Sequence, residues 1–493
     1  MPSLLAHSAQ EQTFVDVEFL RYFGCPARYA TFALTGKPKG ASGYFRFGPD
    51  LICYGRRASG QPAARVRPGL DDALPDVGLR GSTPQLSFNP SEIVDNLRHE
   101  LYVAANHRGE AGVSASSLLQ SAYYLARPLL AISVRKHLQR IRLRGWEDIR
   151  FPRWPVDPTV EGIFEELMAL TLKCHSVDRI PFIWFWPRGA QSCVVMTHDV
   201  ETAAGRDSCG TLMDLDDEYG IEASFQVVPE GRYAVSDGFL DSIRARGFEI
   251  NVHDLNHDGK LFGNKRRFQR RAERINHYGR QFGAEGFRSA ALYRNLEWLS
   301  TLDFAYDMSV PSVGHLEAQG GGCCSVMPFF MGGMTELPVT TTQDYALFHI
   351  LNQHSIDLWT RQIASITKRH GLVSFIVHPD YIRTRRTSDT YKRLLDHLAG
   401  LRAEAKHWFA LPGAVSRWWR NRSRMKLVQR GHAWEIEGPG KEQARVAFAS
   451  LVGGKVLYRL DMLVMMLLGD WSSGAAMIGE AACSLTAACL LWF

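Results

Sequence analysis

The stretch Cys193-Val-Val-Met-Thr-His-Asp-Val-Glu201 determines how the rest of this chain is interpreted. A short apolar run, Val194 to Met196, ends abruptly in a threonine, a histidine and two acidic residues separated by valine. This pattern predicts a buried β-strand with acidic side chains at its C-terminal end, where α/β folds place their chemistry. Asp199 and Glu201 are therefore the first candidates for a functional site.

A second apolar segment further along the chain ends in the same way. Glu249 to Val252 runs into His253-Asp-Leu-Asn-His257. Two histidines four residues apart lie on one side of a helical turn, so both imidazoles can reach one ion. A carboxylate with paired imidazoles suits a divalent transition metal such as Zn²⁺, with open positions left for water and substrate.

The two motifs resemble those of the polysaccharide deacetylases, the NodB-like proteins of carbohydrate esterase family 4. The family's second motif, His-Ser/Thr-x-x-His, matches at His253 and His257. Its first motif, Thr-Phe-Asp-Asp, matches at Asp199, whereas Val200 stands at the second aspartate, a metal ligand in the family. Divergent relatives carry Asp-Val-Asp or Asp-Val-Glu. The resemblance therefore implies Asp199 as the base and Glu201 as the metal ligand, and the reverse assignment stays open.

The resemblance extends to three further motifs. Arg288 matches the arginine of the third motif, which holds the base ionised, although Ala290 replaces the motif's proline. His378 ends an apolar segment as in the fifth motif and would be the general acid. Asp307 lies where the fourth motif's aspartate would fall, and its implied role is to keep the imidazole protonated. Asp344 is a competing candidate for that role.

The segment 190–424 carries these motifs and alternates strand-like with helix-like patterns. Such alternation predicts βαβ units and a parallel sheet. The resemblance implies an α/β fold, a distorted (β/α) barrel of NodB-homology type, usually with seven strands. We expect an N-terminal α+β module at 1–189, in which Val15 to Tyr22 has a β-like pattern. A small β-rich appendage with an apolar tail is expected at 425–493.

The composition is that of an ordinary folded protein and gives little support for nucleic-acid binding. A length of 493 residues suits two or three domains, and 45% hydrophobic with 22% charged residues is ordinary for a folded protein. A net charge of +6 over this length gives little support for a nucleic-acid partner, so we expect none. Nine scattered cysteines indicate reduced thiols, and the start of the chain lacks a signal-peptide pattern. These features predict a cytoplasmic location.

The segment from Ala475 to Phe493 is mostly apolar, and Glu480 is its only charged residue. It could pack on the appendage or on a partner subunit, or it could anchor the chain in a membrane. A carboxylate at the centre of a bilayer costs ~2.5–3.5 kcal/mol even on the lenient insertion scale. We therefore expect packing, with membrane association as the alternative.

The function that the resemblance implies is metal-dependent hydrolysis of an N-acetyl group on an amino sugar, with acetate and a free amine as products. A cytoplasmic location favours a carbohydrate precursor over a finished cell-wall polymer. Two alternatives remain open. Val200 favours a non-catalytic member that binds glycan or scaffolds an assembly, and an amidase acting on a non-sugar C–N bond is equally compatible with the motifs.

Overall fold

The computed structural model describes residues 13–103, 141 and 143–461 of this chain. The apolar tail from Ala475 to Phe493 and the first twelve residues, on which the signal-peptide prediction rests, lie outside the described residues. Within the described ranges, no helix combines the length and the apolar character needed to cross a bilayer. All of the site residues predicted from the sequence belong to the described part of the chain.

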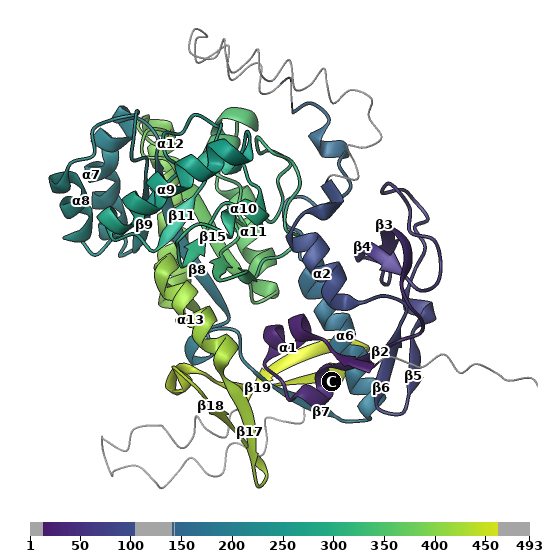
Figure 1. Cartoon of the computed structure of the whole chain (residues 1–493). Helices are drawn as coiled ribbons and strands as arrows, with labels where there is room; N and C mark the ends of the chain where they lie inside the picture. The colour runs from purple at the N-terminus through teal and green to yellow at the C-terminus, as the bar shows by residue number, and fades with distance from the viewer. Residues whose placement is uncertain (1–12, 104–140, 142, 462–493) are drawn as a thin grey trace, which may run out of the picture.

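One curled sheet of nine strands forms the barrel (Figure 1). Its order is β13-β14-β12-β11-β10-β9-β8-β15, and β16 also pairs with β8. The strands are β8 (Ser192–Val200), β9 (Ala223–Val227), β10 (Glu249–His253), β11 (Gly286–Arg288), β12 (Tyr306–Asp307), β13 (Phe329–Met331), β14 (Met334–Glu336), β15 (Leu372–Val377) and β16 (His407–Phe409). Only β13 and β14 pair antiparallel, so seven consecutive strands from β14 to β15 run parallel. The predicted α/β class with a parallel sheet is confirmed.

Two threonine side chains connect the segment after β14 to strand β15. Thr340 Oγ1 donates to the Leu372 carbonyl at 2.7 Å, and Thr341 Oγ1 donates to the Ser374 carbonyl at 2.7 Å. The Ser374 backbone N–H donates back to Thr340 Oγ1 at 2.9 Å. Together with a backbone bond from the Thr341 N–H to the Ser374 carbonyl at 3.3 Å, these bonds join the segment after β14 to β15 without regular strand pairing.

Strand β8 lies between β9 and β15 in the parallel sheet, and all nine of its residues are buried. A strand covered on both faces needs a near-continuous apolar run, which is what Val194 to Met196 supplies. Asp199 pairs in register with Gln226 of β9, and His198 pairs with Val377 of β15. The residues that follow β8 and β15 therefore leave the sheet side by side.

Helices cover the outer face of the sheet (Figure 1). They are α7 (Ala203–Glu218), α8 (Asp237–Arg244), α9 (Lys265–Phe282), α10 (Leu296–Leu299), α11 (Asp357–Lys368), α12 (Arg385–Ala403) and α13 (Pro412–Arg424). Helix α9 shows the pattern: Asn264 caps its start, Gly283 at φ 59° ends it, and Phe268 is buried against the sheet. Its many arginines therefore face outward.

The N-terminal segment contains both strands and helices. They are β1 (Thr13–Val15), α1 (Val17–Phe23), β2 (Thr31–Leu34), β3 (Lys39–Arg46), β4 (Ile52–Arg57), β5 (Gly78–Arg80), β6 (Thr83–Leu86), α2 (Pro90–Arg98), α6 (Thr159–His175) and β7 (Arg179–Ile183). The prediction that Val15 to Tyr22 is β-like is wrong beyond Val15, because the residues from Val17 onward form helix α1. The Asp16 carboxylate accepts from the Phe19 backbone N–H at 2.8 Å and caps a helix, which Gly24 ends at φ 61°.

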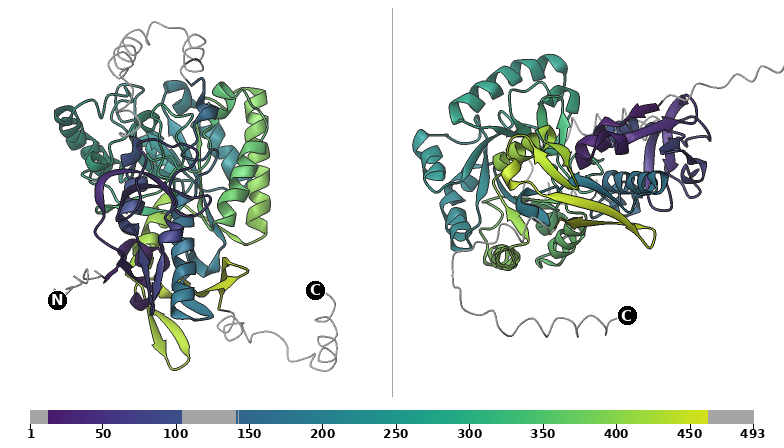
Figure 2. Two further views of the ribbon diagram at one scale, coloured as in Figure 1. Left: turned by 90° about the vertical axis from the view of Figure 1, so that its right-hand side faces the viewer. Right: turned by 90° about the horizontal axis from the view of Figure 1, so that it is seen from below.

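The C-terminal segment contributes β17 (Lys426–Arg430), β18 (Ala433–Glu437), β19 (Val446–Val452) and β20 (Lys455–Leu460). Strand β19 pairs antiparallel with both β20 and β7. One three-stranded sheet therefore joins the last strand of the N-terminal segment to the C-terminal segment, and Figure 2 shows the purple N-terminal segment beside the barrel. The divisions at 189/190 and 424/425 stay predictions.

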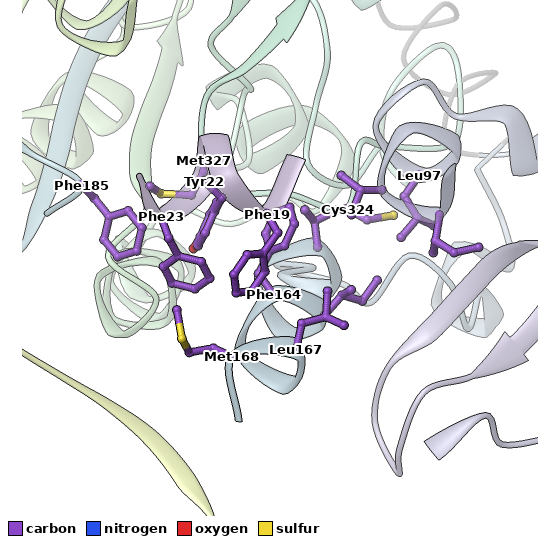
Figure 3. Packing of buried hydrophobic residues seen from close by; sticks show 14 of the residues in the cluster. Phe19, Tyr22, Phe23, Leu97, Phe164, Leu167, Met168, Phe185, Cys324 and Met327 are labelled. Carbon is purple, nitrogen blue, oxygen red and sulfur yellow. The ribbon is translucent and has the colours of Figure 1, made fainter. Parts of the chain in front are cut away.

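An aromatic core holds the N-terminal segment together and includes residues of the barrel (Figure 3). Tyr22 of α1 stacks on Phe164 of α6 with ring centroids 4.5 Å apart. Cys324 and Met327, from the loop between β12 and β13, are fully buried in the same cluster. Burying such a side chain stabilises the fold by about 1.5–3 kcal/mol, so this loop is held by the N-terminal core.

Candidate active site

The strands of the barrel present the candidate residues at their C-terminal ends. Asp199 lies near the end of β8 and Glu201 directly follows that strand. His253 is the last residue of β10, Arg288 is the last residue of β11, and His378 follows β15. Because these strands are parallel, their C-terminal ends meet at one mouth of the barrel.

Asp199 and Arg288 form a buried ion pair at this mouth. Arg288 Nη1 donates to Asp199 Oδ1 at 2.6 Å and to Thr197 Oγ1 at 2.8 Å, and its Nε donates to the Met308 carbonyl at 3.0 Å. Burial acts to raise the pKa of Asp199, but the Arg288 guanidinium and His253 outweigh it and lower that pKa below its ordinary value. The carboxylate is therefore held ionised, as a base must be.

Glu201 lies among three imidazoles. Its Oε1 is 2.8 Å from His257 Nε2, 3.7 Å from His253 Nε2 and 3.4 Å from His378 Nε2. Burial acts to raise the pKa of Glu201, but these histidines together lower it well below its ordinary value. The side chain keeps 17% exposure and so reaches the open side of the mouth.

His253 and His257 do not lie on a helical turn, and that sequence-based prediction is wrong. His253 ends a strand, and the loop after it doubles back through left-handed backbone at Asp254 (φ 54°) and His257 (φ 52°). The Asp254 N–H donates to the Arg288 carbonyl at 2.8 Å and holds the loop on β11. The two rings still meet, with centroids 4.9 Å apart. Such backbone costs about 1–3 kcal/mol per residue and is typical of functional sites.

Glu201, His253 and His257 form a set that we call the metal triad, because their ligand atoms lie within 4.8 Å of one another. His253 Nδ1 lies 3.1 Å from the Arg288 carbonyl, which can only accept, so Nδ1 carries the proton and Nε2 keeps its lone pair. His253 Nε2 and His257 Nδ1 are buried without a hydrogen-bond partner, and His257 Nε2, 2.8 Å from Glu201 Oε1, forms no well-aligned hydrogen bond to it. Orphaned imidazole nitrogens beside a carboxylate fit a divalent metal such as Zn²⁺.

His378 is held by Asp344, which corrects the expectation that Asp307 would hold it. Asp344 Oδ1 lies 2.6 Å from His378 Nδ1, and Asp344 Oδ2 accepts from the His378 backbone N–H at 2.7 Å. Burial acts to lower the pKa of His378, but the Asp344 carboxylate outweighs it and raises that pKa well above its ordinary value. Asp344, the competing candidate from the sequence, is therefore the carboxylate in contact with His378.

Asp307 ends β12 at the same edge of the sheet but bonds elsewhere. Its two carboxylate oxygens accept from Ser309, one from the hydroxyl at 2.7 Å and the other from the backbone N–H at 3.0 Å. Asp307 also pairs in register with Glu336 of β14. Burial raises the pKa of Asp307, and burial together with Asp307 raises the pKa of Glu336 well above its ordinary value. These two acids form a separate buried pair.

A buried histidine behind the site was not found from the sequence. His198 Nε2 lies 2.8 Å from Asp216 Oδ2, and its Nδ1 lies 3.2 Å from the Val377 carbonyl. The Tyr391 hydroxyl donates to the other oxygen of Asp216 at 2.5 Å. This network connects β8, β15, α7 and α12 beside Asp199 and His378. No local pattern marks these residues, because the partners lie far apart in the chain.

No protein-family model and no curated protein matches the chain. A provisionally assigned polysaccharide deacetylase from Mycobacterium smegmatis is a structural match at 17% identity, covering 48% of this chain and 92% of its own, with a TM-score of 0.38. The Puue allantoinase matches at 12% identity over 48% and 92%, with a TM-score of 0.39. The peptidoglycan deacetylase PdaC from Bacillus subtilis matches at 12% identity over 47% and 93%, with a TM-score of 0.30. The curled, mostly parallel α/β sheet of the structure itself agrees with the distorted (β/α) barrel expected from the sequence.

Proposed function

We propose that this chain hydrolyses an N-acetyl group on an amino sugar or a glycan precursor, with a divalent metal held by the metal triad. The observation that carries the proposal is that three groups lie together at one mouth of the barrel. They are the metal triad, the ionised base candidate Asp199, and the imidazole of His378. Amide hydrolysis needs a Lewis acid, a base and a proton donor, and these groups supply one each, whereas none of them alone would indicate the reaction.

The chain's own residues divide the proton transfers between them. When bound, a divalent metal supplies Lewis acidity toward the amide carbonyl and toward water. Asp199, kept ionised by Arg288, accepts a proton from the attacking water. His378, kept protonated by Asp344, donates a proton to the departing nitrogen. The C–N bond breaks, a C–O bond forms, and one water is consumed to give acetate and a free amine.

The contacts support Glu201 as the ligand and Asp199 as the base rather than the reverse. Asp199 already receives the Arg288 guanidinium at 2.6 Å, which leaves its carboxylate engaged with a cation. Glu201 Oε1 lies 2.8 Å from His257 Nε2 and 3.7 Å from His253 Nε2, so the three atoms are placed to share one ion. A carboxylate with two imidazoles is a donor set typical of catalytic zinc sites.

The alternative of a non-catalytic member rests on Val200, which replaces the family's second aspartate. Val200 is fully buried in the hydrophobic core of the barrel, so it does not face the mouth. Glu201, one residue further, brings a carboxylate to the imidazoles in its place. The complete Asp199–Arg288 and His378–Asp344 pairs also favour turnover over a scaffold that has lost it.

Acetate release tests the proposal. We expect release from at least one member of a panel of N-acetylated sugar nucleotides and lipid-linked N-acetyl sugars. EDTA should abolish it and added Zn²⁺ should restore it. An N-acyl compound without a sugar, included in the panel, identifies the amidase alternative. Glycan binding by the metal-loaded protein without release from any compound would contradict the proposal and support the non-catalytic alternative.

A further inference from the structure

The loop between β12 and β13, residues 308–328, lies at the mouth of the barrel, and we call it the mouth loop. It leaves the C-terminal end of β12. It returns at Phe329, which pairs with Glu336, the last residue of β14. Both of its ends are therefore on the catalytic edge of the sheet.

A residue of the N-terminal segment holds the mouth loop through a buried ion pair. Glu100 is 7% exposed and Arg294 is 5% exposed. Arg294 donates from Nε to Glu100 Oε2 at 2.6 Å and from Nη2 to Glu100 Oε1 at 2.5 Å, which is a two-pronged contact. The same guanidinium donates to the Gly320 carbonyl at 3.0 Å, and the Gly322 N–H donates to Glu100. Glu100 thus binds the mouth loop both directly and through Arg294.

Other contacts between the N-terminal segment and the mouth loop surround this pair. The Tyr102 hydroxyl donates to the Gly322 carbonyl at 2.6 Å, and Ser325 Oγ donates to Glu161 Oε1 at 2.5 Å. Cys324 is buried in the aromatic core (Figure 3). Glu100 itself adopts a left-handed backbone, φ 56°, which a non-glycine residue keeps only when its surroundings hold it there.

The mouth loop also contacts the residue next to the partner of His378. Gln343 Nε2 donates to Glu317 Oε2 of the mouth loop. Asp344, which follows Gln343, receives both the ring and the backbone N–H of His378. Glu317 is only partly buried and borders the cavity that Thr340 and Gln362 line. A continuous chain of contacts therefore runs from Glu100 to His378.

We propose that the N-terminal segment completes the active site, with Glu100 and Arg294 as positioning residues that hold the mouth loop and, through Glu317 and Gln343, the segment carrying Asp344. The consequence for activity rests on the proposed deacetylase function, whereas the consequence for structure does not. An isolated barrel would lack this support, because Glu100 and the N-terminal residues of the aromatic core lie outside it.

Two neighbouring glycines of the mouth loop provide a matched test in the full chain. A Cβ at Gly321 would lie 2.7 Å from Glu100 Oε1 and 2.8 Å from Val103 Cγ2, whereas a Cβ at Gly320 would meet nothing within 4 Å. Gly321 also has φ 105°, which strains any side chain, whereas Gly320 has no such φ. Gly321→Ala should therefore displace the mouth loop from Glu100, through crowding and backbone strain together, without changing any charge. Gly320→Ala is the control, and Glu100→Gln removes the ion pair directly.

Hydrogen exchange of backbone amides is the first measurement. Gly321→Ala and Glu100→Gln should speed exchange at residues 313–324 and also at residues 342–346, while Gly320→Ala should change neither. Acetate release is the second measurement. The two variants should lower kcat/KM by about tenfold or more, since a misplacement of about 1 Å at a catalytic group can cost about 100-fold. Combining Glu100→Gln with Glu317→Gln should lose little beyond the single variants, because both act through one contact chain.

Faster exchange confined to 313–324, together with wild-type kcat/KM, would overturn the proposal. Wild-type kcat/KM in Gly321→Ala would overturn it as well. If the wild-type protein releases no acetate, the proposed function fails. The exchange rate of the backbone amides at 342–346 then decides whether the positioning role holds. A faster rate in Gly321→Ala but not in Gly320→Ala supports that role, and an unchanged rate refutes it.

Discussion

The carboxylate of Asp344 contacts His378 twice, with Oδ1 2.6 Å from the ring Nδ1 and Oδ2 accepting from the backbone N–H at 2.7 Å. One contact orients the imidazole and the other fixes the strand end that carries it. Nε2 is left facing the mouth, 3.4 Å from Glu201 Oε1. This is the arrangement that a proton donor to a leaving amine requires.

Asp344→Asn should move the alkaline limb of the pH–rate profile to lower pH. The pKa of His378 is raised by Asp344, so its protonated form persists to higher pH, and activity falls as the pH rises through that pKa. Removing the carboxylate's charge lowers that pKa. Asp307→Asn should leave the limb in place, because Asp307 bonds to Ser309 instead. A limb that moves with Asp307→Asn and not with Asp344→Asn would refute this assignment.

His378→Ala should lower kcat by ~10²–10⁴-fold, the usual contribution of a general acid, while metal stays bound. The reason is that the proposed function gives His378 Nε2 the role of proton donor and gives the metal to the metal triad, although Asp199, Glu201 and His378 also lie close enough together to hold an ion. Turnover and metal content are measured on the same preparation. Loss of metal in step with activity would show that His378 is a ligand instead.

Asp199→Asn and Glu201→Gln should separate the base from the ligand. Asp199→Asn should remove turnover and keep metal, because the amide cannot accept the water's proton. Glu201→Gln should lose metal, because the neutral amide is a poorer ligand than the carboxylate between two imidazoles. Metal content by elemental analysis and acetate release by a coupled assay provide the two readouts. The opposite pattern would exchange the two roles.

His253→Ala and His257→Ala should each abolish stoichiometric metal binding without unfolding the chain. Both side chains lie at the end of β10 or in the loop beyond it rather than in the barrel core. His277→Ala is a suitable control, because His277 is an exposed residue of α9. Metal content and far-UV circular dichroism are compared across the three variants. Wild-type metal occupancy in either site variant would contradict the assignment of the metal triad.

The location of the protein and its carbohydrate partner stay predictions, as do the domain boundaries. The metal triad, by contrast, was foreseen from two motifs alone, and its three members lie together in the structure. The contact between Asp199 and Arg288 was expected from the family resemblance, and the two side chains are in contact. The local signal, an apolar run ending in polar residues, indicated the strand and the edge at which it ends, and the resemblance supplied the pairing.

The choice between Asp307 and Asp344 needed the tertiary structure. Asp307 ends β12 and Asp344 lies in the segment between β14 and β15, and no local pattern says which of them faces His378 across the barrel. The answer depends on how the segment after β14 crosses to β15, where Thr340 and Thr341 bond to the carbonyls of the neighbouring strand. That crossing is a contact between residues distant in sequence, so periodicity cannot report it.

The sequence by itself determined the α/β class, the edge of the sheet that carries the chemistry, and the donor types available there. Burial and spacing within single strands set these features. The tertiary structure alone decided which carboxylate holds His378, how the loop at His257 doubles back, and that β7 pairs with β19. The physical reason is that these features arise from long-range hydrogen bonds and shared burial, whose partners are separated by tens to hundreds of residues.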